Sequence, residues 1–346
     1  MTELYELTVH ESASLIRSGE VSPIDLVGSM LNQIRRLEPL LKAWVYLDED
    51  AVIKDAQLKE QEANSGSNLG RLHGVPIGLK DIYHNAPIPT TACSKVYANF
   101  VPDHDATTVS KLKQAGAIML GKTVTTEFAC ADPSPTINPW NPDHTPGGSS
   151  SGSAVSVASR MCPAALGSQT VGSVLRPASY NGVVGFKPTL GRVSRYGDMT
   201  VSWSLDTVGP IALTADDCGT ILETISVPDH LDSTTPFKRN TLLHFGLRDK
   251  VKLAVIKDNC LHADKDTMSK GSQGGPDPTR NKLNEWRQPV QINLWQDGSG
   301  KLNVTAADWV KTDQWNKMEA HNKEKASAKK WTKAQQMKKW SEDTRG

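Results

Sequence analysis

Short, wholly apolar segments alternate with helix-like segments along the first two thirds of the chain. Residues 105–120, DATTVSKLKQAGAIML, have the pattern of an amphipathic helix with Val109 and Leu112 facing inward, then a glycine stop, then an apolar run. Residues 151–166, SGSAVSVASRMCPAAL, repeat this order with a helix of small residues. Apolar runs without polar alternation are typical of strands covered on both faces. The alternation therefore predicts an α/β layered domain.

Local start and stop signals place further elements. Ser22 is the predicted N-cap of a helix that has Pro23 at its first position. Asp105 is the predicted cap of the helix within residues 105–120, and Gly116 is predicted to end it. A short buried strand is expected within residues 73–83, HGVPIGLKDIY. Two other amphipathic helices are expected within residues 7–18 and 50–65.

The charge distribution divides the 346 residues into two unlike parts. Residues 1–237 carry a formal charge of −8 and residues 238–346 carry +9. The segment 271–280, GSQGGPDPTR, has the composition of a linker, and residues 291–306 have the alternation of a β-hairpin that turns at Asp297-Gly298. We therefore expect a core over residues 1–260, a linker over 261–280, and a basic, Trp-containing segment of unknown role over 281–346.

Several protein classes are disfavoured by composition. The five cysteines are odd in number and show no CxxC spacing, which indicates reduced thiols and no disulfide framework or zinc site. The N-terminal segment carries acidic residues early, unlike a signal peptide, and no stretch approaches the roughly 20 apolar residues that span a bilayer. We expect a cytoplasmic protein with no membrane partner, no bound metal and no cofactor.

The Gly/Ser-rich stretch TPGGSSSGSAV at residues 145–155 has three simple interpretations. A flexible linker is disfavoured because a small-residue helix and a buried strand follow at once. A phosphate-binding loop needs a lysine after its last glycine, and none occurs between residues 146 and 160. A hydrolase elbow with Ser150 in GxSxG needs a preceding strand, which the proline-broken segment NPWNPDHTP does not supply.

Three long motifs in a fixed order are more specific. They are HGVPIGLKDIY at 73–83, TPGGSSSGSA at 145–154, and ALGSQTVGSVLRPASYNGVVGFKPTLGRVS at 165–194. Together they resemble the amidase signature family, over about residues 5–235. The resemblance implies a layered α/β/α fold with a mixed central sheet. Family members commonly run 100 or more residues longer, and the match ends after residues 251–259, so we expect a fold that is C-terminally truncated or replaced.

The resemblance also implies a Ser–cis-Ser–Lys triad. Ser173 matches the nucleophile, Ser149 matches the bridging serine whose peptide bond is cis in the family, and Lys80 matches the base. A lysine acts as a base only when neutral, so its pKa must fall from about 10.4. The apolar neighbours of Lys80 favour this through desolvation, whereas Asp81 would oppose it if it faced the same way.

In the family the oxyanion is bound by backbone N–H groups just before the nucleophile. Here they belong to Thr170, Val171, Gly172 and Ser173. Two positions depart from the common pattern: position 169 is Gln where many members have Asp, and position 171 is Val where Gly or Ala is usual. If position 171 needs a positive φ, the β-branched side chain would strain it. Glu127, Arg176 and Asp206 are interpreted as structural residues.

Three functions are consistent with the sequence. The first is an amidase, a hydrolase that cleaves a small-molecule carboxamide through an acyl-serine intermediate. The second, from the same family, is the transamidating subunit of a tRNA-dependent amidotransferase, which uses ammonia from glutamine and needs a partner subunit. The third is a catalytically impaired scaffold whose basic tail binds nucleic acid, although a solvated tail is the better interpretation of that charge. A homodimer is also allowed.

Overall fold

The computed structural model describes residues 3–66, 69–130 and 133–235, together with strand residues 293–296 and 302–305. Met1–Gly246 form one compact unit and Leu247–Gly346 a second. The helices are α1 Val9–Ser18, α2 Pro23–Leu41, α3 Glu49–Asn64, α4 Thr107–Gln114, α5 Ser151–Ala158, α6 Leu175–Asn181 and α7 Ala215–Ile225, with short 3₁₀ turns at Leu4–Glu6, Lys95–Tyr97 and Glu127–Ala129. The strands are β1 Trp44–Tyr46, β2 Pro76–Lys80, β3 Ile118–Thr123, β4 Ala164–Gln169, β5 Val184–Gly185, β6 Thr207–Ala212, β7 Asn293–Gln296 and β8 Leu302–Thr305.

The helices begin largely where the sequence signals place them. Thr8 and Glu11 form a reciprocal capping box at the start of α1. The Ser22 hydroxyl accepts the backbone N–H groups of Ile24 and Asp25, with Pro23 at the first position of α2. The prediction for Asp105 is wrong. Helix α4 begins after Ala106 without a side-chain cap, because the Asp105 carboxylate is occupied elsewhere, by the Ala86 N–H and the Lys113 ammonium group.

Six strands form one mixed sheet in the order β1-β3-β2-β4-β6-β5. Strands β3, β2 and β4 run parallel to one another, while β1, β6 and β5 pair antiparallel to their neighbours. The pairing of β2 with β4 sets Leu79 opposite Leu166 and so brings residues 80 and 168 to the same edge of the sheet. The mixed sheet confirms the predicted α/β/α architecture.

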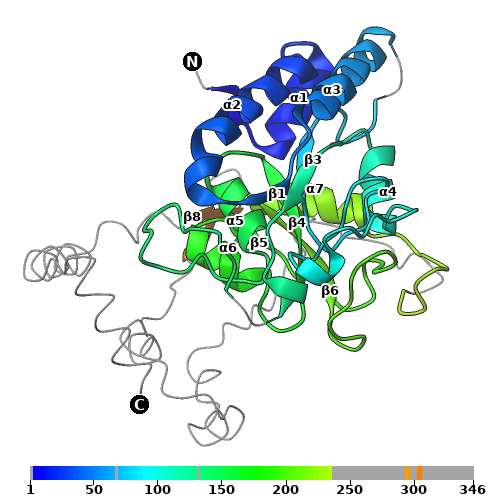
Figure 1. Cartoon of the computed structure of the whole chain (residues 1–346). Helices are drawn as coiled ribbons and strands as arrows, with labels where there is room; N and C mark the ends of the chain where they lie inside the picture. The colour runs from blue at the N-terminus through cyan, green and yellow to red at the C-terminus, as the bar shows by residue number, and fades with distance from the viewer. Residues whose placement is uncertain (1–2, 67–68, 131–132, 236–292, 297–301, 306–346) are drawn as a thin grey trace, which may run out of the picture. The chain divides into compact units, whose positions relative to one another are not determined.

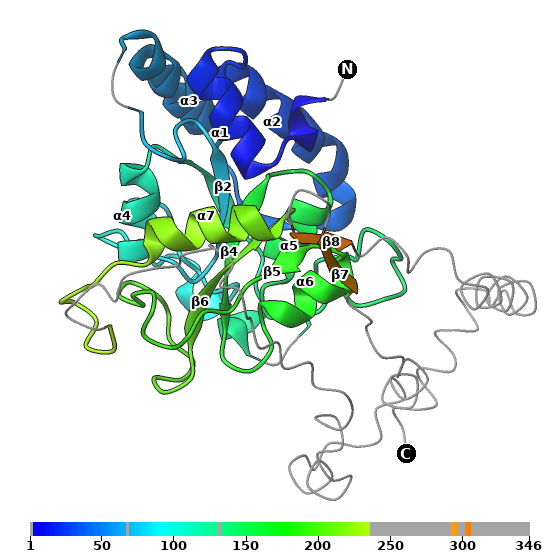
Figure 2. The ribbon, with the colours of Figure 1, turned by 180° about the vertical axis from the view of Figure 1, so that it is seen from behind.

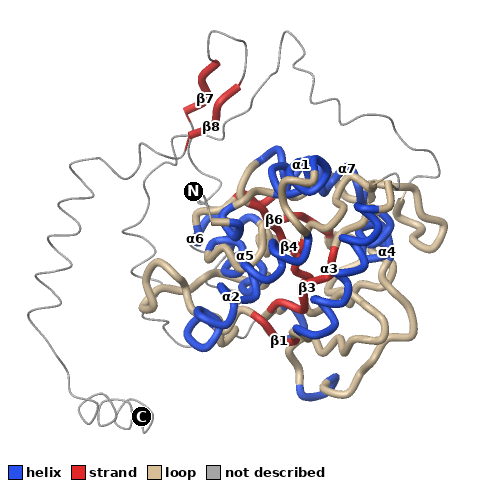
Figure 3. The backbone as a smooth tube through the Cα atoms, turned by 90° about the horizontal axis from the view of Figure 1, so that it is seen from above, coloured by secondary structure: helices blue, strands red, loops and turns tan. Residues whose placement is uncertain are grey.

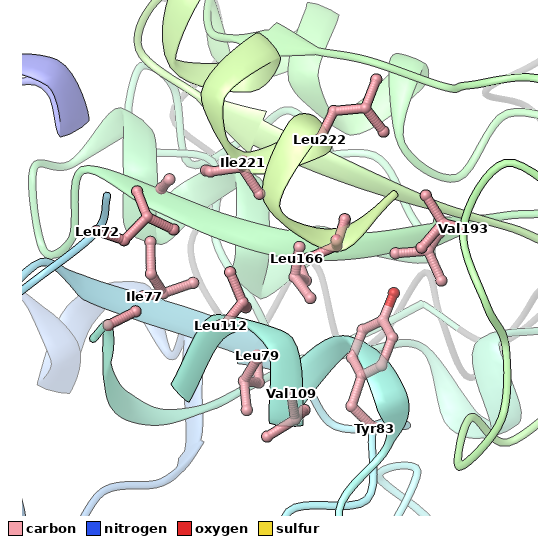
Figure 4. Close-up of a cluster of buried hydrophobic side chains, with 14 of the residues drawn as sticks. Leu72, Ile77, Leu79, Tyr83, Val109, Leu112, Leu166, Val193, Ile221 and Leu222 are labelled. Atoms are coloured by element: carbon pink, nitrogen blue, oxygen red, sulfur yellow. The ribbon is translucent and has the colours of Figure 1, made fainter. Parts of the chain in front are cut away.

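Each face of the sheet packs against its own set of helices (Figures 1 and 2). On one face α4 and α7 supply Val109, Leu112 and Ile221 to a cluster that contains Ile77, Leu79 and Leu166 of the strands, with Tyr83 beside them (Figure 4). On the other face α2 and α5 cover the alternate strand residues. Figure 3 shows the strands between these helices. The two faces alternate residue by residue because successive strand side chains point oppositely.

Two further predictions can be compared with the structure. Strands β7 and β8 pair antiparallel, with Leu294 opposite Val304, which confirms the predicted hairpin pairing. Its expected turn, the linker over 261–280 and most of the basic segment over 281–346 lie outside the described residues. In the part of the chain that is described, no helix combines the length and apolar character that crossing a membrane requires.

Helix α5 lies so close to the sheet that Gly152 has no room for a side chain. A Cβ there would overlap the carbonyl oxygen of Ala43 and the backbone nitrogen of Val124. We predict that Gly152→Ala lowers the free energy of unfolding by about 1–3 kcal/mol, as measured by urea denaturation. Gly28→Ala in α2 is the matched control, since no atom lies within 4 Å of its new Cβ. That variant should be stabilised by about 0.5–1 kcal/mol. Equal stability of the two variants would contradict the close approach.

Candidate active site

Lys80 is the last residue of β2, and its side chain is completely buried. Its Nζ lies 2.7 Å from Ser149 Oγ and 2.8 Å from Ser168 Oγ. Ser149 begins the turn before α5, and the peptide bond that joins it to Gly148 is cis. The sheet order explains why these residues meet, because β2 lies beside β4, which carries Ser168, and α5 packs on both strands.

Burial lowers the pKa of Lys80 to about 7. The main cause is loss of hydration, since an ammonium group is poorly solvated in a protein interior. The negative charge of Asp206 opposes the shift. At neutral pH a large share of Lys80 is therefore an uncharged amine, whose lone pair can accept a proton from the Ser149 hydroxyl.

Asp81 does not face Lys80. Its carboxylate lies 3.2 Å from the Lys122 ammonium group, and both side chains are fully buried. The same carboxylate accepts hydrogen bonds from the Thr91 N–H and hydroxyl. Strand alternation has thus separated a buried ion pair from the neighbouring lysine, and the acid that could have kept Lys80 protonated is engaged elsewhere.

Ser173 lies next to the serine-rich turn. Its backbone carbonyl accepts the N–H of Ser150 at 3.3 Å, which joins the two segments. Among the described residues its hydroxyl has no hydrogen-bond partner, so the structure brings Lys80 and Ser149 into direct contact and leaves the Ser173 hydroxyl unpaired. An unpaired hydroxyl beside this turn is available to a ligand.

Gln169 fixes the loop that carries Ser173. Its Oε1 accepts the N–H groups of Val174 and Leu175, and its Nε2 donates to the Val171 carbonyl. Within the described chain the N–H groups of Val171, Gly172 and Ser173 donate no hydrogen bond. Val171 is 85% exposed and is not among the residues with positive φ. The expected strain at this position is therefore absent, and three backbone donors remain unused next to the hydroxyl.

Arg176 supports the turn from the other side. Its guanidinium group donates two hydrogen bonds to the Gly148 carbonyl oxygen, from Nε at 3.0 Å and from Nη2 at 2.6 Å. Asp206 accepts the Thr170 hydroxyl and the N–H groups of Val201 and Ser202, and Glu127 accepts the Ser94 hydroxyl. These contacts agree with the structural interpretation of the three residues, and they give Arg176 a specific position beside Ser149.

Ser168 was missed by sequence reasoning. It follows the apolar run Ala164–Gly167 near the end of β4, and a polar residue directly after a buried run was the available signal. Ser150, the candidate elbow residue, is fully buried and has its hydroxyl between the backbone N–H and carbonyl of Ser168. That side chain holds α5 against β4. No cluster of three or more His, Cys, Asp or Glu residues able to hold a metal occurs in the described part of the chain.

Comparisons with known proteins identify relatives of this chain. The family model described as Amidase matches residues 25–286. A glutamyl-tRNA(Gln) amidotransferase subunit from Prochlorococcus marinus is 44% identical over 235 residues, which cover 66% of this chain and 48% of that protein. The corresponding protein of Halothermothrix orenii is 44% identical over 257 residues, covering 72% and 52%. The chain spans about half the length of the curated relatives it matches.

Solved structures show the same fold. The native peptide amidase of Stenotrophomonas maltophilia superposes with a TM-score of 0.65 at 38% identity, over 68% of this chain and 51% of that one. A glutamyl-tRNA(Gln) amidotransferase subunit from Thermotoga maritima gives a TM-score of 0.60 at 36% identity, over 69% and 51%.

Lys80 should leave a signature in the pH dependence of stability. Its pKa is about 7 in the folded protein and about 10.4 in an unfolded chain. Between these values the unfolded state binds a proton that the folded state lacks, so Lys80 makes stability rise with pH in this window. We predict that the free energy of unfolding rises more steeply with pH between 7 and 10 in the unmodified protein than in Lys80→Met. Urea denaturation followed by circular dichroism measures this difference.

The difference between the two slopes of unfolding free energy against pH should approach about 1.4 kcal/mol per pH unit. Lys54→Met, at an exposed position of α3, is the matched control and should follow the unmodified protein. Parallel curves for the unmodified protein and Lys80→Met would show that Lys80 titrates normally.

Proposed function

Because the chain belongs to the amidase signature family, we propose that it cleaves the C–N bond of a small carboxamide through an acyl-serine intermediate. The observation that carries the proposal is the buried amine of Lys80, 2.7 Å from Ser149 Oγ. A neutral lysine in contact with a serine hydroxyl supplies the proton acceptor that an unactivated serine nucleophile needs. Ser173, beside this pair, is the proposed nucleophile.

In the first step Ser173 Oγ attacks the carbonyl carbon of the amide. Its proton passes to Ser149 Oγ, and the proton of Ser149 passes to the Lys80 amine, which becomes an ammonium group. Ser149 can serve as the bridge because one hydroxyl donates and accepts at once. The carbonyl electron pair moves to oxygen, where the unused N–H groups of the Thr170–Ser173 segment can stabilise it. One such donor is worth about 10²–10³ in rate.

In the second step the tetrahedral intermediate collapses and the C–N bond breaks. The leaving nitrogen takes a proton from Ser149, and Lys80 returns its proton to Ser149. The acyl group remains on Ser173 as an ester. Water then repeats the sequence as the nucleophile, activated through Ser149 and Lys80, and releases the carboxylic acid. Arg176 acts as a positioning residue in this scheme because it holds the Gly148 carbonyl directly before the bridging serine.

A second candidate is a transamidating protein that passes the amide nitrogen to an acceptor. The specific observation in its favour is that relatives at 39–44% identity are named as subunits of glutamyl-tRNA(Gln) amidotransferase. This role would require a partner protein. Turnover of simple carboxamides by the isolated chain would favour the amidase. Release of ammonia from glutamine, with no turnover of other simple carboxamides, would favour the transamidating role.

The proposed setting is the cytoplasm. Each of the four described cysteines is a free thiol, which suits a reducing compartment. Cys162 and Cys218 are buried, and burial raises the pKa of each to about 12, so these two thiols stay protonated at neutral pH.

We predict that a fluorophosphonate probe forms one covalent adduct, on Ser173. The unpaired hydroxyl and the adjacent backbone donors are the physical reason. Intact-mass spectrometry should show the adduct in the unmodified protein and none in Ser173→Ala. Ser179→Ala, at an exposed serine in α6, is the matched control and should be labelled normally. Persistent labelling of Ser173→Ala would assign the nucleophile to another residue.

We predict that amide hydrolysis rises with pH and is half-maximal near pH 7, where Lys80 loses its proton. Lys80→Arg should lose at least about a hundredfold in kcat/KM, because arginine stays charged and cannot accept the proton. Lys54→Arg is the control at an exposed lysine. A Lys80→Arg variant that works at the normal rate would remove Lys80 from the mechanism while leaving the Ser173 labelling result intact.

A further inference from the structure

A cavity of about 340 Å³ lies apart from Lys80, Ser149, Ser168 and Ser173. We call it the α3 cavity. It is formed by one side of α3, by β3, by the turn at residues 85–88 and by the end of α4. The labels of α3, β3 and α4 mark this region in Figure 1. Its lining residues with polar side-chain groups are Tyr46, Asp48, Asp55, Lys59, Asn85 and Lys113. The proposed amide chemistry makes no use of this cavity.

Asn85 is the most unusual of these residues. Its side chain is 1% exposed, and within the described chain neither Oδ1 nor Nδ2 has a hydrogen-bond partner. A buried amide with both ends unsatisfied is costly, and each such group in a native protein calls for a partner. Asn85 is one of the lining residues, and its Oδ1 and Nδ2 lie behind the wall surface, so a rotation of this side chain toward the cavity would let a bound molecule pair with them. An amide pairs best with a group that both donates and accepts, such as another carboxamide.

Asp55 is the second unused group. Its carboxylate makes no hydrogen bond and no ion pair within 4 Å in the described part of the chain, although it lines the same cavity. Burial raises the pKa of Asp55, and the positive charge of Lys59 is the largest effect opposing that rise. A partly buried carboxylate without a donor has the capacity to accept a charge-assisted hydrogen bond from a cationic group.

The lysines of the cavity are already neutralised. Lys59 pairs with Glu62 at 3.1 Å, and Lys113 pairs with Asp105 at 2.7 Å. The lysine partners together with Asp48 and Asp55 make four carboxylates against two ammonium groups, so the surroundings are net acidic even with His73 beside Glu62. An anion would find both lysines engaged, whereas a cation would meet an unpaired carboxylate.

The rest of the lining is apolar. Val52, Ile88, Met119 and Leu120 contribute to the wall, and Ala51, Ala86 and Ala117 leave space between them. Such a wall suits a short aliphatic body. A ligand that complements this cavity would therefore carry an ammonium group to pair with Asp55, a carboxamide to pair with Asn85, and an alkyl group to pack against the apolar wall.

We propose that the α3 cavity is a binding site for a small primary ammonium compound that carries a carboxamide and an aliphatic side chain, the chemistry of an amino-acid amide. The ammonium group binds Asp55, and the carboxamide exchanges two hydrogen bonds with Asn85. Occupancy would give partners to Asp55 and Asn85, which have none among the described residues. This site is separate from the proposed catalytic residues.

The test is isothermal titration calorimetry with L-leucinamide on the full-length chain carrying Ser149→Ala, so that the probe is not consumed. We expect saturable binding in the millimolar range or tighter. Asp55→Asn should weaken it at least about tenfold, the loss expected for a charge-assisted hydrogen bond. Asp50→Asn is the matched control, the same change at an exposed position of the same helix, and should bind normally.

Probe chemistry gives an independent comparison. Isoamylamine lacks the carboxamide, and 4-methylpentanamide lacks the ammonium group, so each should bind more weakly than leucinamide. Asn85→Leu should abolish the preference for leucinamide over isoamylamine. If that variant does not fold, the proposal is still tested by comparing Asp55→Asn with Asp50→Asn and by comparing the three probes.

Two results would overturn the proposal. One is the absence of binding at millimolar leucinamide. The other is binding that Asp55→Asn leaves unchanged, which would place the probe elsewhere, including at the proposed catalytic site. Labelling of Ser173 by the fluorophosphonate is measured separately, so failure of the α3 cavity and failure of the proposed function are distinguishable.

Discussion

The burial of one lysine side chain is the constraint on which the site depends. Lys80 lies at the end of a central strand with no access to water, and within the described residues its amine contacts two serine hydroxyls and no carboxylate. Desolvation costs the charged form far more than the neutral form. The sheet therefore holds the amine in its basic state, and the serines supply hydrogen bonds without supplying the negative charge that would reverse the effect.

The surrounding contacts keep those serines in place. Ser149 is held through the Gly148 carbonyl by Arg176, and Ser150 bridges α5 to β4. Gln169, the last residue of β4, holds the loop that follows this strand by accepting the N–H groups of Val174 and Leu175. Arg176 and Ser150 each join segments distant in sequence, so the site is a product of sheet order more than of any local motif.

Much of this was accessible from sequence. Helix caps such as Ser22 depend on a few neighbouring residues, and the buried strand before Lys80 is evident from its apolar neighbours, so both were predicted correctly. The side-chain partners were harder. Asp105 is a residue type that often caps helices, but its carboxylate instead accepts hydrogen bonds from the Ala86 N–H and the Lys113 ammonium group. Ser168 contacts Lys80 only because β2 and β4 are adjacent in the sheet. Val171 is unstrained because its φ is not positive, and a backbone angle cannot be read from the residue type.

The Asp81–Lys122 ion pair has a consequence for how the protein tolerates change. Two lysines stand on neighbouring parallel strands, with Lys122 opposite Leu79 and therefore one residue out of register with Lys80. One keeps a carboxylate partner at 3.2 Å and the other has only hydroxyls within the described residues. Because successive strand residues point to opposite faces, a one-residue insertion or deletion in β3 would turn Lys122 away from Asp81 and leave that carboxylate without its partner. The ion pair in this part of the core therefore depends on the register of β2 and β3 as well as on the side chains that the strands carry.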